Sequence, residues 1–152
     1  MTADPKNLRW YIRRDVPRIV RIERLCFDHP WSKEDFLAAM RQSNCIGMVY
    51  DGAPATKGQD VRGYMIYELH NSELRVLNLG VHPEWQRTGI ATAMVERLKD
   101  KLSQQRRKRI TLETNESNLP SQLFWRACGF KCVRVERDFY PQPKEDAYVF
   151  RY

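Results

Sequence analysis

A candidate anion-binding loop lies between a predicted strand and a predicted helix, at Gln86-Arg87-Thr88-Gly89-Ile90-Ala91. The first turn of a helix has N–H groups without intrahelical acceptors, and the helix dipole favours a negative charge there. Gly89 has no side chain, so a ligand could approach the main chain closely. These amides could therefore bind a pyrophosphate. The residues alone favour this reading and an ordinary turn about equally.

Several other site classes are disfavoured by residue spacing. The loop lacks the Gly-Lys-Ser/Thr ending of a Walker loop, and it is not a G-x-G-x-x-G motif. None of the four cysteines forms a C-x-x-C pair, and the three histidines are scattered upstream of Cys128 and Cys132. We therefore expect four reduced thiols and no metal site.

The hydrophobic pattern predicts the element order β-α-α-β-β-β-α-β-α-β-β. The predicted strands are 8–12, 45–50, 61–69, 73–81, 109–114, 131–139 and 147–152, and the predicted helices begin near residues 15, 33, 90 and 118. Because a helix connects strands 73–81 and 109–114, these two strands should be parallel within a mostly antiparallel sheet. The sequence therefore predicts a mixed α/β (α+β) fold with helices on both faces.

Composition indicates one globular domain over residues 1–152. The chain is 42% hydrophobic, and no apolar run approaches the roughly 20 residues of a membrane span. The first residues contain no apolar signal segment, so we expect a cytoplasmic protein. The net charge of +7 fits a nucleic-acid partner, an anionic ligand or solubility alone. Its densest cluster, Arg106-Arg107-Lys108-Arg109, follows a predicted helix, where cations favour the helix dipole.

Two segments carry a family resemblance. The run Asn78-Leu79-Gly80-Val81-His82-Pro83-Glu84-Trp85-Gln86-Arg87-Thr88-Gly89-Ile90-Ala91 resembles motif A of the GNAT superfamily of acetyl-CoA-dependent N-acetyltransferases. The run from Asn118 through Trp125 to Gly129-Phe130 is similar to that superfamily's Asn-x-x-Ala-x-x-x-Tyr-x-x-x-Gly-Phe segment. The resemblance implies a GNAT-like sheet with one splayed parallel strand pair and a single N-acetyltransferase domain.

Three further segments resemble the ribosomal-protein-alanine N-acetyltransferase branch. They are His29-Pro30-Trp31-Ser32, the run 112–118, and Phe139-Tyr140-Pro141 followed by Glu145-Asp146-Ala147. The branch implies acetyl transfer to the N-terminal α-amine of a protein, such as a ribosomal protein. Near relatives share these features, so a small-molecule amine acetyltransferase remains an alternative. A CoA-binding or RNA-associated module without catalysis is another. No membrane partner is expected, and nucleic-acid contact is only weakly supported.

The resemblance also implies a set of cofactor contacts for acetyl-CoA. The pyrophosphate would bind the main chain of Gln86, Arg87, Thr88, Gly89, Ile90 and Ala91, where Ala91 replaces the family's last glycine. The pantetheine arm would pair with Leu79, Gly80 and Val81. The Val81 N–H would then stabilise the developing charge on the thioester oxygen. Asn118 would contact the arm, or cap its helix, and Trp125 takes the position of the family's tyrosine.

Acid–base chemistry is implied by the same resemblance. Transfer to an amine requires a neutral nitrogen, so a base helps, and the family's base position holds Glu113. Strand alternation places Glu113 on the face opposite Ile110 and Leu112. The family's acid position holds Trp125, whose indole cannot deliver a proton at neutral pH. Tyr140 could replace that acid, solvent could protonate the thiolate, or Tyr140 could only pack against the acceptor.

Overall fold

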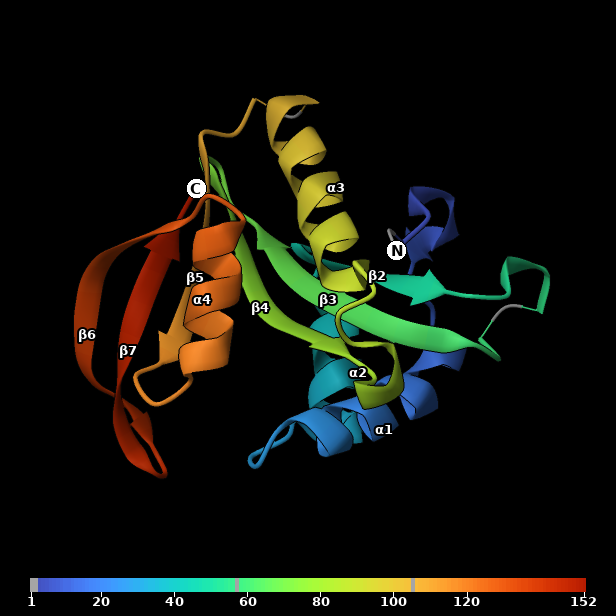
Figure 1. Ribbon diagram of the computed structural model, residues 1–152, viewed down its shortest axis with the longest axis horizontal. Coiled ribbons are helices and arrows are strands. Elements are labelled where there is room, and N and C mark those ends of the chain that lie inside the picture. The colour runs from blue at the N-terminus through green and yellow to red at the C-terminus, as the bar shows by residue number, and fades with distance from the viewer. Residues whose placement is uncertain (1–2, 57, 105) are drawn as a thin grey trace.

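The computed structural model describes residues 3–56, 58–104 and 106–152. Within these ranges, seven strands form one sheet in the order β1-β2-β3-β4-β5-β7-β6, and only β4 and β5 are parallel (Figure 1). The strands are β1 Leu8–Trp10, β2 Cys45–Asp51, β3 Val61–Leu69, β4 Glu73–Val81, β5 Arg109–Asn115, β6 Lys131–Pro141 and β7 Lys144–Arg151. The helices are α1 Val16–Cys26, α2 Lys33–Arg41, α3 Ile90–Gln104 and α4 Leu119–Ala127. The predicted order and fold class are confirmed.

Two hydrophobic cores lie on opposite faces of the sheet. One core joins α3 and α4 to the sheet through residues such as Met94, Leu98 and Trp125. The other joins α1 and α2 to the sheet through residues such as Ile19 and Phe36. Helices therefore cover both faces, as the sequence predicts. None of the helices in the described part of the chain combines the length and apolarity that crossing a bilayer requires.

Local signals explain where the helices begin. Ser32 and Asp35 form a capping box at the start of α2, in which each side chain accepts a hydrogen bond from the other residue's N–H. The side chain of Asn118 caps α4 by accepting a hydrogen bond from the N–H of Ser121, at 3.2 Å. Gly129 follows α4 with a φ of +93°, a left-handed conformation that favours glycine.

Strands β4 and β5 pair over only three residues and then diverge. Their register runs from Glu73↔Arg109 to Arg75↔Thr111. Beyond Arg75, β5 continues antiparallel to β7, while β4 stays paired with β3. A register shift in the β3–β4 ladder leaves Leu77 as an extra residue, and such a bulge bends a strand. The edge of β4 that faces β5 is therefore open from Val76 onward; we call it the open β4 edge.

The C-terminal hairpin differs from the prediction. Strand β6 runs to Pro141 rather than ending at 139, and β7 begins at Lys144 rather than at 147. Two register shifts interrupt the β6–β7 ladder, and Val133, Val135 and Phe139 remain 39%, 44% and 43% exposed. β6 lies at the edge of the sheet, where bulges and a proline are tolerated because one side of the strand needs no ladder partner.

Candidate active site

The main chain of Val81 points toward the open β4 edge. The N–H of His82 donates to the carbonyl of Arg62 at 2.8 Å, so residues 62 and 82 form a hydrogen-bonded pair. The next pair, Gly63 and Val81, is then a non-hydrogen-bonded pair, whose N–H and C=O groups point away from the partner strand. The N–H of Val81 is therefore directed to the edge from which β5 has diverged.

Two side chains converge on the main-chain carbonyl group of Val81. The carbonyl of Val81 accepts hydrogen bonds from the thiol of Cys26 and the side-chain amide of Gln86, both at 3.1 Å. Burial raises the pKa of Cys26, which keeps the thiol protonated as a donor. The sequence predicts a role only for the main chain of Gln86. The structure adds a side-chain role, which fixes the loop against the end of β4.

The predicted anion-binding loop has the geometry of an open helix N-terminus. Arg87 and Gly89 adopt positive φ values of 64° and 90°, and a glycine tolerates this region without strain. The hydroxyl of Thr88 donates to the carbonyl of Trp85 at 2.6 Å, which closes the turn. The first α3 hydrogen bond runs from the N–H of Ala93 to the carbonyl of Gly89. The N–H groups of residues 90–92 therefore precede the helical ladder, where an anion can bind.

A buried glutamate connects this edge of the sheet to the α1–α2 loop. Glu23 is 2% exposed, and its carboxylate accepts hydrogen bonds from the side chains of Asn78 and Tyr64 and from the N–H of Trp31. The Tyr64 ring leaves no room for a side chain at Gly80, because a Cβ there would lie 2.6 Å from the Tyr64 hydroxyl. Leaving a buried partner unsatisfied costs about 1–3 kcal/mol, so Glu23 holds these elements together.

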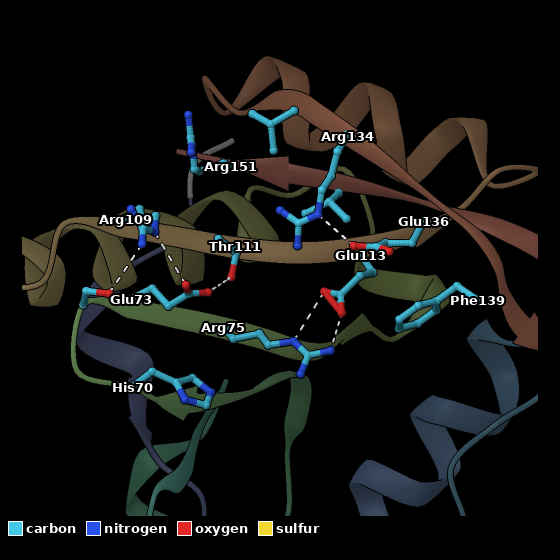
Figure 2. A pocket seen from close by; sticks show the side chains of 13 residues that line it. His70, Glu73, Arg75, Arg109, Thr111, Glu113, Arg134, Glu136, Phe139 and Arg151 are labelled. Atoms are coloured by element: carbon cyan, nitrogen blue, oxygen red, sulfur yellow. Dashed lines mark hydrogen bonds and ion pairs between the residues drawn. The ribbon is translucent and has the colours of Figure 1, made fainter.

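Glu113 projects into a cleft of about 640 Å³ (Figure 2). Ile110 and Leu112 are buried, and Glu113 lies on the opposite face of β5, as the alternation predicts. Arg75 donates to both carboxylate oxygens: Nη2 bonds Oε1, and Nε lies 3.4 Å from Oε2. The candidate base is therefore ion-paired to a residue for which the sequence predicts no role.

Tyr140 lies in the electrostatic field of the same ion pair. Burial raises the pKa of Tyr140 to about 12; the charges of Glu113 and Glu145 add to the increase, and that of Arg75 opposes it. The phenol therefore remains protonated throughout the neutral range. It can donate a hydrogen bond near Glu113, but it is a weaker acid than an ordinary tyrosine.

The remaining predicted residues lie on the α3–α4 side of the sheet. Trp125 is 3% exposed and packs its ring 4.9 Å from that of Phe130, in the core that also contains Leu112. It therefore lies on the opposite face of β5 from Glu113. Ile90 is also buried there, and Leu79 packs against this core. The cofactor contacts of Asn118, Trp125 and Leu79 stay predictions. Within the described ranges, no group of three or more His, Cys, Asp or Glu side chains could hold a metal ion.

Comparison with known proteins gives a family match over most of the chain. Residues 16–130 match the family described as "Acetyltransferase (GNAT) family". The "[Ribosomal protein bS18]-alanine N-acetyltransferase" of Escherichia coli (strain K12) is 26% identical over 137 residues, which cover 89% of this chain and 88% of that protein.

Solved structures show the same fold. The crystal structure of the ribosomal-protein-S18-alanine N-acetyltransferase from Escherichia coli aligns with a TM-score of 0.81 at 23% identity, over 95% of this chain and 90% of that one. Arabidopsis thaliana NAA60 in complex with acetyl-CoA aligns with a TM-score of 0.80 at 20% identity, over 95% and 96%. At these identities the likeness establishes the fold alone.

Proposed function

Since the chain belongs to the acetyltransferase (GNAT) family and is an acetyl-CoA-dependent N-acetyltransferase, we propose that it acetylates the N-terminal α-amine of a protein, with Glu113 as general base. The observation that carries the catalytic part is the placement of Glu113. It is a carboxylate in an accessible cleft, on the strand that diverges from the open β4 edge. A ribosomal protein is the acceptor class suggested by the relative that acts on bS18.

The residues present fit acetyl-CoA, which supplies the activated acetyl group. The amides at the start of α3 and the left-handed Gly89 form a cradle for the pyrophosphate. The open β4 edge offers the N–H of Val81 to the thioester oxygen, where a preformed donor stabilises developing charge. Ala91 replaces the family's usual glycine with a side chain of a single methyl group.

Glu113 would move the proton that the amine must lose. The amine nitrogen forms a bond to the acetyl carbon and the carbon–sulfur bond breaks, while Glu113 accepts the proton from nitrogen directly or through a water. The departing thiolate takes a proton from solvent or from Tyr140. The sulfur and nitrogen are thereby each left neutral, and no oxidant or metal is required.

An α-amine suits this arrangement better than a lysine side chain. With reference pKa values near 7.8 and 10.4, roughly a quarter of α-amines are neutral at pH 7.4, against about one in a thousand lysines. An α-amine therefore depends less on Glu113 for the loss of its proton than a lysine side chain does. The sequence similarity to an alanine N-acetyltransferase supports the same acceptor class.

A peptide panel tests this proposal. Acetyl transfer is measured for peptides with free N-termini, for the same peptides with blocked N-termini and one internal lysine, and for polyamines. We expect kcat/KM for the free N-termini to exceed the other values by at least about 100-fold, in line with the neutral fractions. Preference for polyamines would favour the small-molecule alternative, and no transfer to any amine would favour a non-catalytic CoA-binding or RNA-associated module.

Tyr140→Phe tests whether the phenol is an acid or an acceptor contact. Because the pKa of Tyr140 is raised to about 12, proton delivery to the thiolate is unfavourable, and we expect a contact role. The variant should raise KM for the peptide about three- to tenfold and change kcat less than about threefold. A kcat loss as large as that of Glu113→Gln would instead make Tyr140 the acid. Steady-state kinetics with varied peptide separates the two results.

A further inference from the structure

We propose that Arg75 is a positioning residue that holds Glu113 toward the acceptor and offsets its negative charge. This inference rests on the proposed role of Glu113 and adds a residue that neither the sequence pattern nor the family match identifies. Arg75 contacts Glu113 through two nitrogens, a two-point contact that fixes the orientation of the carboxylate as well as its charge.

The sheet register places this pair at the point of divergence. Arg75 is the last β4 residue paired with β5, opposite Thr111. Thr111 and Glu113 are two residues apart on β5 and share a face, so Arg75 reaches across to the first residue beyond the paired segment on that face. The side chains are 38% and 13% exposed for Arg75 and Glu113. The ion pair therefore bridges the two strands where they begin to separate.

The guanidinium has two consequences for a base at this position. The two-point contact limits rotation of the carboxylate, so Glu113 presents its oxygens to the acceptor in one orientation. The same cation offsets the charge of Glu113, so the site attracts a substrate ammonium less strongly than a bare carboxylate would. Weaker attraction of an ammonium favours an acceptor that arrives as a neutral amine, and this property distinguishes an α-amine from a lysine.

Other charged groups face the pair from the surrounding elements. Glu68 on β3 lies 3.7 Å from Arg75 Nη1 and 3.1 Å from His70 Nε2. The other titratable groups near the pair are Glu73, Arg109, Arg134, Glu136, Tyr140, Glu145 and Arg151. The hydrogen bond to Glu113 is the largest cause of the raised pKa of Arg75, ahead of the charges of Glu68 and Glu73. Arg75 is thus coupled most strongly to Glu113.

Arg75→Met removes the guanidinium and keeps most of the aliphatic stem. Because the carboxylate loses its fixed orientation, we expect kcat at pH 7 to fall about tenfold and KM for acetyl-CoA to change less than about twofold. Arg75→Lys keeps the charge but loses the two-point contact, so it should restore only part of the rate. Arg137→Met is the matched control, because it breaks an arginine–carboxylate pair with Asp146 on the C-terminal hairpin; its kcat should match that of the wild type.

A second readout separates this inference from the proposed reaction. The kcat loss from Arg75→Met is measured in the wild type and again in the Glu113→Gln background. A residue that acts through Glu113 has little to position once the carboxylate is gone, so the loss in the Glu113→Gln background should be less than about twofold. An equal kcat loss in both backgrounds would overturn the role of Arg75. Full activity of Glu113→Gln itself would instead show that the proposed base is wrong.

Discussion

Glu113→Gln should lower kcat by roughly 100-fold or more at pH 7, with acetyl-CoA affinity nearly unchanged. The substitution keeps the size of the side chain and the strand geometry but removes the ability to accept a proton. Part of the loss should be recovered toward pH 9, because the acceptor α-amine is then neutral before it binds. The measurement is a pH–rate profile for the wild type and the variant with one saturating peptide.

A remote ion-paired glutamate provides the control for that experiment. Glu96 on α3 pairs with Lys99 at 3.2 Å, and Glu96→Gln makes the same chemical change on the other side of the sheet. It should retain wild-type kcat. Equal activity of Glu113→Gln and the wild type across the pH range would remove Glu113 as the base, and the mechanism would then need another proton acceptor.

Gly89→Val should abolish most of the thermal stabilisation that acetyl-CoA gives the protein. Ligand that binds only the folded state raises Tm by mass action, so loss of the Tm shift reports loss of binding. A valine crowds the main-chain amides that would hold the pyrophosphate. It also disfavours the φ of +90° that the loop requires, because β-branched residues avoid this region. Thermal unfolding with and without saturating acetyl-CoA measures the effect.

Strain alone must be separated from lost binding. Gly129 has a similar φ of +93° but lies at the far end of α4, where a Cβ would meet only the Tyr152 ring at 3.5 Å. Gly129→Val should lower the Tm of the free protein comparably and keep the acetyl-CoA shift. A full shift in folded Gly89→Val would contradict the placement of the pyrophosphate at the start of α3.

The sequence predicts elements well where periodicity and caps agree. Strands β3 and β4 have the predicted bounds, because both runs are rich in apolar residues and a short polar turn separates them. The start of α2 follows from Ser32 and Asp35. The side of β5 that carries Glu113 also follows from alternation, since Ile110 and Leu112 fix the buried face.

Tertiary register is what the sequence pattern does not contain. The sequence of β4 does not show that pairing with β5 stops at Arg75. The contact between Arg75 and Glu113 depends on that register. The two residues are 38 positions apart in the sequence, and no sequence pattern indicates that they meet. The bounds of β6 and β7 differ from the prediction for a related reason, because the bulges of this hairpin place apolar residues such as Val133 in solvent.

One peptide that carries both a free α-amine and an internal lysine tests the proposed acceptor most directly. Wild-type protein and acetyl-CoA are incubated with this peptide at pH 7.4, and tandem mass spectrometry locates the added acetyl group. We predict that the acetyl group is found almost entirely on the α-nitrogen and that Glu113→Gln slows its appearance. Acetylation mainly of the lysine, or no acetylation under conditions where acetyl-CoA raises the Tm, would contradict N-terminal acetyl transfer by this protein.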